Sequence, residues 1–434
     1  MKFAANMMAA VAVLFCSNAA AQTQTGFAAP VESSIQSVLP RMIEWRRDFH
    51  QNPELSYEEV RTARIVAQHL RSLRMEVRTG VAQTGVVGVL RGGRPGPVIA
   101  LRADMDALPV TEGGDLPFRS RARGRYNGQD VGIMHACGHD THVAILMAAA
   151  SVLAAQREQL AGTVIFVFQP SEEGAPPGGL GGARRMLAEN VFGDLQPEAM
   201  FGLHAWPGEG GTVTMIPGPM MAGSDRIDIT VTGAQTHGAQ PHAGIDPIVV
   251  SSQIVNALQT IPSRQMDAVR SPVIVTIGSI HGGVRYNIIP QTVEMQGTIR
   301  YLNPDTREEL YTRIRRVVTE TAAASGATAE VTITENAIPT VNPPALLARA
   351  RVAAVRALGE DRVLAGQPVM PAEDFAYFQQ AVPGVYFFYG VNPPGLTTEE
   401  AAPNHNPRFF VHEPTMETGL RAMLAVALDR VGGA

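Results

Sequence analysis

The sequence predicts an α/β protein, with a main domain built on a mostly parallel sheet flanked by helices and split by an inserted α+β domain. Two patterns lead to this prediction. Up to about Gly218, amphipathic helical stretches alternate with short apolar strands, as in domains with a parallel sheet. Beyond that point the order becomes β-α-β-β-α-β, which is typical of an antiparallel sheet with helices on one face. With 434 residues, the chain is long enough to form two cores.

The elements of the main domain follow from hydrophobic periodicity. Helical patterns cover residues 39–52, 57–75, 141–156 and 182–190, and apolar strands cover 86–90, 98–102, 164–168 and 200–203. After Pro343, helical patterns return at 345–358, 373–381 and 416–431.

The inserted domain is predicted as a four-stranded antiparallel sheet with two helices. Its strands are expected at 226–234, 272–280, 292–302 and 329–337, and its helices at 246–261 and 307–324. We therefore divide the chain into a leader (1–21), the first part of the main domain (22–217), the inserted domain (218–335) and the second part of the main domain (336–434).

The N-terminus has the pattern of a cleaved export signal. Lys2 is followed by the apolar stretch "MMAAVAVLF" and by the small residues Ala19 to Ala21. A buried N-terminal helix and a lipid anchor on Cys16 fit less well, the latter because bulky Phe15 precedes the cysteine. We expect a mature chain that begins near Gln22 and is periplasmic or secreted.

Composition excludes several classes of function. Without the leader the chain has a net charge of −6, because Lys2 is the only charged residue lost from 35 basic and 40 acidic side chains. Such a surface gives no electrostatic reason to bind nucleic acid or anionic membranes. Lys2 is also the only lysine, so the mature chain has neither a Schiff-base lysine nor a phosphate-loop lysine.

Cys137 would be the only cysteine of the mature chain, and it lies within "HACGHD" just before a predicted helix. A single cysteine excludes an intrachain disulfide, and an exposed thiol in an oxidising compartment is a liability. A small buried core residue is the ordinary interpretation, but it does not explain the histidines two residues away on each side. A metal would hold the sulfur as a thiolate and shield it.

Other polar clusters follow the ends of predicted strands, where ligands gather in open α/β sheets. Asp104 and Asp106 follow one strand, Glu172 and Glu173 follow a second, and His204 lies at the end of a third. Thiolate, imidazole and carboxylate together suit zinc or a similar divalent transition metal. Adjacent glutamates leave a loop in different directions, so one can bind metal while the other takes a proton from water.

The clusters together resemble the binuclear metallo-amidohydrolases and carboxypeptidases that include aminoacylases, hippurate hydrolases and auxin-conjugate hydrolases. The resemblance rests on stretches that occur in family order from about Ile43 to Phe409, and these include "ALRADMDALPV", "MHACGHDTH", "FQPSEEG", "GLHAWP", "YNIIP", "AEDFAYF" and "NHNPRF".

The resemblance implies a role for each matching position. It implies two divalent ions per subunit, zinc or manganese first and cobalt or nickel as alternatives, with Glu172 as the general base. Asp104 and Asp106 would orient the ligands from behind. The implied metal ligands are Cys137, His139, Glu173, His204 and His405.

The inserted domain is, by the same resemblance, a lid that also forms a homodimer. His237 matches a histidine that reaches the neighbouring subunit's site and steadies an oxyanion, and Asn287 matches a residue near the substrate carboxylate. Two features depart from the family pattern. Gln235 and Thr236 stand where Gly-Gly is common, and the loop after Glu173 is longer than the family's short form.

We therefore expect an exported metal-dependent amidohydrolase that cleaves N-acyl-amino acids, with a small-molecule substrate and neither nucleic acid nor membrane as partner. A carboxypeptidase or dipeptidase acting on short peptides would use the same site. A catalytically silent binder of metals or conjugates is the alternative from another class, but it would have no need of Glu172. A scaffold whose lid contacts another protein is a weaker alternative.

Overall fold

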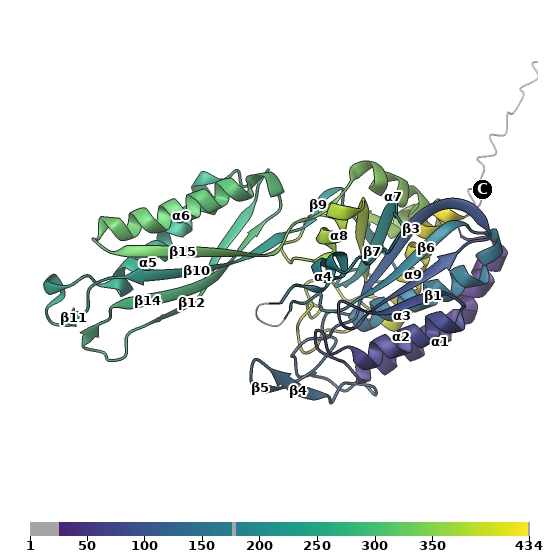
Figure 1. Cartoon of the computed structure of the whole chain (residues 1–434), viewed down its shortest axis with the longest axis horizontal. Helices are drawn as coiled ribbons and strands as arrows, with labels where there is room; N and C mark the ends of the chain where they lie inside the picture. Colours follow the sequence, from purple (N-terminus) through teal and green to yellow (C-terminus); the bar gives the residue numbers. More distant parts are fainter. Residues whose placement is uncertain (1–25, 176–178, 433–434) are drawn as a thin grey trace, which may run out of the picture.

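The computed structural model describes residues 26–175 and 179–432, which form two lobes joined by a narrow connection (Figure 1). The predicted leader, residues 1–21, lies outside the described residues. In the parts of the chain that the structure describes, no helix is both long and apolar enough to cross a membrane.

The larger lobe is built on an eight-stranded sheet. Its four central strands run parallel, and the strand that adjoins them on each side is antiparallel to its central neighbour. Since parallel strands end at the same edge, their carboxyl ends bring together the loops that follow them. The strands in spatial order are β1 (Glu76–Val81), β2 (Gly85–Arg91), β6 (Ala161–Gln169), β3 (Arg94–Asp104), β7 (Ala199–Trp206), β18 (Gly384–Gly390), β8 (Val213–Met215) and β17 (Val363–Ala365).

Helices cover both faces of this sheet, so its central strands are buried on both sides. On one face lie α1 (Ala29–Gln51), α2 (Val60–Ser72), α3 (His139–Ala155), α7 (Pro344–Leu358) and α9 (Met416–Val431). On the other face lie the short helices α4 (Gly182–Ala188) and α8 (Phe375–Ala381).

The smaller lobe is the predicted α+β insertion. Its sheet is antiparallel throughout, and one face packs on two helices that contact each other, α5 (Pro247–Leu258) and α6 (Arg307–Ala324). The strands in spatial order are β12 (Val273–Gly282), β14 (Thr292–Tyr301), β10 (Gly223–Thr232) and β15 (Thr328–Ala337).

Small two-stranded ladders complete the fold. In the connection between the lobes, β9 (Gly218–Met221) pairs with β16 (Thr340–Asn342). At the far end of the smaller lobe, β11 (Thr236–His237) pairs with β13 (Ile288–Ile289) (Figure 1). A hairpin of β4 (Arg123–Tyr126) and β5 (Gln129–Gly132) precedes α3.

The sequence patterns missed one central strand and misplaced several helix starts, including that of α2, which begins at Val60 and not at residue 57. Only helices were expected after Pro343, yet β18 lies in the middle of the sheet. Its side chains alternate between the two cores, so "GVYFFYG" is apolar on both faces and lacks the alternation of a half-buried strand. Helix α1 begins at Ala29 and continues through Pro40, and α8 begins at Phe375, two residues later than predicted.

Candidate metal centre

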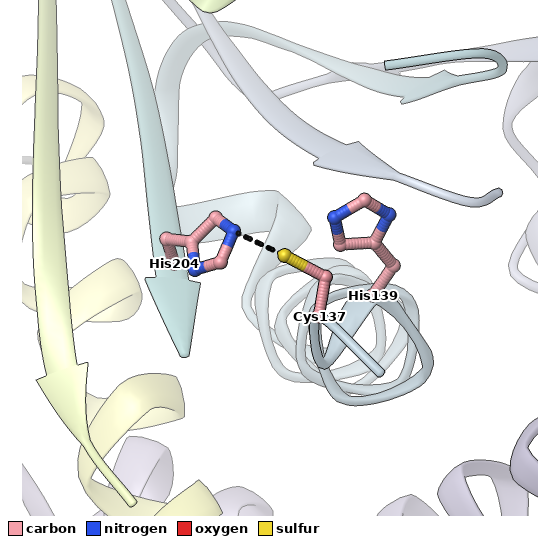
Figure 2. Close-up of side chains that lie close together, drawn as sticks. All are labelled: Cys137, His139 and His204. Atoms are coloured by element: carbon pink, nitrogen blue, oxygen red, sulfur yellow. Dashed lines mark hydrogen bonds between the residues drawn. The ribbon is translucent and has the colours of Figure 1, made fainter. Parts of the chain in front are cut away.

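The predicted ligands converge at the carboxyl ends of β3, β6 and β7. Asp104 ends β3, Glu172 and Glu173 follow β6, and His204 lies within β7. The N-terminus of α3 meets them there and supplies two further ligands, Cys137 and His139 (Figure 2). His405 comes from the loop between β18 and α9.

Gly138 determines how α3 begins. Its φ of 91° is left-handed, and a Cβ atom there would lie 2.7 Å from the Cβ atom of Ala205. Only glycine tolerates both this backbone angle and this close approach to β7. The glycine therefore lets Cys137 and His139 reach the end of β7 from either side of one tight turn.

Cys137, His139 and His204 form the first group of possible ligands. One donor atom from each lies within 4.8 Å of the others, and Cys137 Sγ is 3.4 Å from His204 Nε2 (Figure 2). All three side chains are buried. A compact thiolate and two imidazoles match the ligand preferences of zinc and its neighbours.

Hydrogen bonds hold both imidazoles of this group in the tautomer that a ligand needs. Nδ1 of His204 lies 2.7 Å from the carbonyl oxygen of Ala205, and Nδ1 of His139 lies 2.8 Å from that of Asp106. Because carbonyl oxygens only accept, each Nδ1 donates its proton, and in the neutral ring the lone pair is then on Nε2. Nε2 of His139 is buried without a hydrogen-bond partner in the described chain.

Cys137, Glu173 and His405 form a second group, which shares the cysteine with the first. Nε2 of His405 lies 3.2 Å from Oε1 of Glu173. The backbone of His405 has a φ of 68°, and its N–H donates to the carbonyl of Ala136 at 2.7 Å. Cys137 is therefore a member of both groups of possible ligands.

The electrostatics of the centre also fit bound cations. Burial raises the pKa of the Cys137 thiol well above its usual value, and the carboxylates of Glu173 and Glu172 raise it further. Burial likewise raises the pKa of Glu172, with Glu373 and Glu173 as the next causes. A bound divalent ion would reverse these shifts, because its positive charge favours the thiolate and the carboxylate.

Asp106 orients the glutamate pair from behind. Its two carboxylate oxygens accept the backbone N–H groups of Glu172 and Glu173, each at 3.0 Å, and Ser56 donates its hydroxyl to the same carboxylate at 2.8 Å. Holding two successive amides fixes the loop after β6, so the two glutamate side chains leave it in defined directions. Asp106 thus lies behind the glutamate pair.

Asp104 also lies behind the ligands, but its main imidazole partner was not predicted. Its Oδ1 accepts from Nδ1 of His142 at 2.6 Å, and Nε2 of His142 accepts the N–H of Ala205 at 2.8 Å. His142 therefore connects β3 to the strand end that carries His204. Its spacing of three residues from His139, on the same helix, was the available signal.

Sequence reasoning gave no role to Arg102, Glu373 or Asp374, which adjoin the centre. The carboxylates of Glu373 and Asp374 form a close group with that of Glu172. The backbone N–H of Asp374 lies 3.4 Å from Glu172 Oε1. The signal was the acidic pair in "AEDFAYF", which lies 200 residues from Glu172 in sequence and so could not be placed by spacing.

His237 and Asn287 lie together but far from the ligands of their own chain. The N–H of Gly238 donates to the carbonyl of Asn287 at 2.8 Å, and His237 pairs with Ile288 in the β11–β13 ladder. Figure 1 places this ladder at the end of the lid opposite the large sheet. Within one chain, the structure therefore separates these two residues from the metal centre.

The chain is similar to known proteins of one family along most of its length. The profile of peptidase family M20/M25/M40 matches residues 100–429. A thermostable carboxypeptidase of Saccharolobus solfataricus is 40% identical over 407 residues, which cover 92% of this chain and 97% of that protein. An IAA-amino acid hydrolase of Arabidopsis thaliana is 36% identical over 398 residues, which cover 89% of this chain and 86% of the relative.

A solved structure extends the likeness to three dimensions. The crystal structure of a dinuclear metal-binding peptidase of the M20 family from Bacillus subtilis superposes with a TM-score of 0.74 at 34% identity. The match covers 91% of this chain and 99% of that one. The chain belongs to peptidase family M20/M25/M40, and it is a metal-dependent hydrolase of amide or peptide bonds.

Proposed function

We propose that this protein is an exported, homodimeric hydrolase that uses two divalent ions to release an amino acid from an N-acyl-amino acid. The observation that most directly supports it is that Cys137 belongs to two ligand groups, with Glu172 next to both. Zinc or manganese suits the donor set, with cobalt or nickel as alternatives. The ions would be held by Cys137, His139, Glu173, His204 and His405.

Glu172 acts as the general base and then as the general acid. Its carboxylate takes a proton from the attacking water as the new C–O bond forms at the amide carbon, and returns that proton to the leaving nitrogen as the C–N bond breaks. When bound, the ions lower the pKa of the water and polarise the carbonyl. The backbone N–H of Asp374 and the carboxylate of Asp106 hold Glu172 in place for both transfers.

His237 completes the site of a second copy of the chain. The N–H of Ala239 donates to His237 Nδ1 at 3.0 Å, so the ring proton is on Nε2, which is free to donate to a developing oxyanion. Asn287, next to His237, would contact the substrate carboxylate. Exposed apolar side chains on neighbouring parts of the lid support a dimer interface there, and they are Ile248 and Val249 of α5 with Ile274 and Ile280 of β12.

Hydrolysis of short peptides from the carboxyl end is the second candidate. The 40% identity to a carboxypeptidase favours it, whereas the 36% identity to an IAA-amino acid hydrolase favours acyl conjugates. Both reactions break an amide next to an amino-acid carboxylate, so the metal centre suits either one. The pocket for the acyl group decides between them.

The test is a hydrolysis assay on the purified mature chain after chelation and reloading with zinc, manganese, cobalt or nickel. Hippurate, N-acetyl-amino acids, auxin conjugates and dipeptides are offered in parallel, and amine release is measured. Release from acyl conjugates that exceeds release from dipeptides supports the proposal. The reverse order selects the carboxypeptidase, and silence with no metal bound would contradict both.

Export is tested separately. Expression of the full chain in a Gram-negative host, followed by fractionation, should yield periplasmic protein whose first residue lies near Gln22. A cytoplasmic product that keeps residues 1–21 would contradict the export assignment without affecting the proposed chemistry.

A further inference from the structure

Arg102 is a buried arginine beside the metal centre with no role in the chemistry described so far. Its guanidinium is 1% exposed and lies among the carboxyl ends of the central strands. Nε donates to Gln169 at 2.8 Å, Nη1 donates to Asp104 at 2.7 Å, and Nη2 donates to Glu373 at 2.8 Å. A guanidinium is costly to bury, so this set of partners indicates a fixed position.

The acidic pair Glu373–Asp374 depends on this arginine for its balancing charge. Nη2 of Arg102 also lies 3.2 Å from Asp374 Oδ1, and no other arginine in the described chain contacts either carboxylate. Two neutral side chains also donate hydrogen bonds to this acidic pair. Tyr386 donates its hydroxyl to Glu373 at 2.6 Å, and Gln169 donates to Asp374 at 2.7 Å. Every contact fixes the segment just before α8.

That segment in turn reaches Glu172. The N–H of Asp374 points to Glu172 Oε1 at 3.4 Å, so the position of this peptide unit sets where the carboxylate of the base can rest. Arg102 also donates to Oδ2 of Asp104, and Oδ1 of Asp104 accepts from Nδ1 of His142. His142 accepts the N–H of Ala205, the residue after His204.

We infer that Arg102 is a positioning residue that couples the base to the metal ligands. Nη2 of Arg102 contacts Glu373 and Asp374, and these two residues hold the segment that contacts Glu172. Nη1 of Arg102 contacts Asp104, which is hydrogen-bonded to His142. The planar guanidinium therefore fixes the distance between the Glu373–Asp374 pair and Asp104. This inference rests on the proposed function, because it takes Glu172 as the base.

Arg102→Lys removes the planar guanidinium while keeping the charge. An ammonium cannot span both sets of contacts, so kcat should fall about 100-fold while KM stays within about threefold, as expected when a base is displaced and substrate contacts are intact. Cobalt affinity should fall about tenfold, the loss typical for groups behind a metal ligand. Glu373→Gln keeps the size of its side chain and should lower kcat about tenfold without changing cobalt affinity.

Arg46→Lys is the matched control. Arg46 is also 1% exposed, and it lies 3.0 Å from Asp140 and 3.3 Å from Glu413, but it does not contact Glu172, Glu373 or Asp374. Its substitution should lower thermal stability to a similar extent while kcat stays within about threefold. If both lysine variants lose kcat equally, Arg102 only stabilises the fold and the inference is wrong.

Two further outcomes separate the inference from the proposed function. If the wild-type protein turns over no substrate, the proposed function fails, and cobalt affinity alone then decides the link from Arg102 to the ligands. Unchanged cobalt affinity in Arg102→Lys overturns that link. If the wild-type protein is active but both Arg102→Lys and Glu373→Gln keep full kcat, the positioning role is wrong although the proposed function stands. If Arg102→Lys does not fold, the kcat of Glu373→Gln alone tests whether the Glu373–Asp374 pair positions the base.

Discussion

Two histidines of the metal centre and the histidine of the lid tip use their ring nitrogens in opposite ways. His139 and His204 are buried, donate from Nδ1 to carbonyl oxygens and leave Nε2 as a lone pair. His237 is exposed, accepts the N–H of Ala239 at Nδ1 and keeps its proton on Nε2. The first arrangement suits a metal ion, and the second suits an oxyanion.

The metal centre and the lid tip also differ in how many of their partner groups come from the same chain. The ligands of the centre come from four segments of one chain and are fixed by hydrogen bonds within it, so the centre is preorganised in a single subunit. At the lid tip, His237 has its Nε2 donor in place, and among the described residues no side chain of the same chain accepts a hydrogen bond from it. This difference is the one expected if the metal centre is complete within one chain and the lid tip acts in the proposed dimer.

Replacement of the base should have the largest effect. Glu172→Gln keeps the shape of the side chain but cannot accept the proton from water, so kcat should fall about 10³- to 10⁴-fold. Metal content, measured by atomic emission, should stay at the wild-type value, because the ligand side chains are unchanged. Turnover at the wild-type rate would contradict the mechanism.

Loss of the shared ligand should weaken metal binding. Cys137→Ser leaves a neutral hydroxyl where both ligand groups need a thiolate, so the affinity for the ions should fall at least about 100-fold. Calorimetric titration of the metal-free protein with zinc measures the change. Wild-type affinity would show that Cys137 is only a buried core residue and that the two groups do not meet at it.

Mixed dimers test whether the lid acts across subunits. His237→Ala alone should lower kcat about 100-fold and leave metal content unchanged, the effect of losing one oxyanion donor. Mixing this variant with Glu172→Gln should restore activity in heterodimers, because the Glu172 of one subunit then meets the His237 of the other. No recovery in heterodimers confirmed by mass would place His237 in its own chain's site or outside catalysis.

The smallest expected effect is an opposite pH dependence of stability in the two lobes. In the inserted lobe, burial raises the pKa of Asp225 from 3.8 to about 6, and its Oδ1 has no hydrogen-bond partner in the described residues. Because the pKa of Asp225 is higher in the folded than in the unfolded state, its contribution to stability is fully present below about pH 4 and is lost as the pH rises through 6. Between pH 4.5 and 7.5, Asp225→Asn should gain about 1–2 kcal/mol relative to wild type.

The control lies in the larger lobe. Arg421 lowers the pKa of Glu32 from 4.5 to about 2, so its contribution is present above pH 4.5 and lost as pH falls toward 2. Thermal unfolding of Glu32→Gln across the same pH range should not show the gain expected of Asp225→Asn. A parallel response of the two variants would contradict the assignment of Asp225.

Much of the fold could be predicted because each domain has its own periodicity. The inserted sheet has one buried face, and strands such as β10 alternate accordingly. β18 escaped prediction because both its faces are buried, so its sequence is uniformly apolar and has no period to detect. Its flanking glycines were the remaining signal.

The sequence by itself indicated which kinds of metal donor are present, because Cys137, histidines and paired carboxylates follow the ends of predicted strands. The choice of individual ligands, and of Glu172 as the base, came from the resemblance of the short motifs to one family. Only the tertiary structure showed that Cys137 belongs to two ligand groups and that Arg102 bridges Asp104 and Glu373. Such contacts join residues that are far apart in the chain, and they form only where parallel strands end at a common edge.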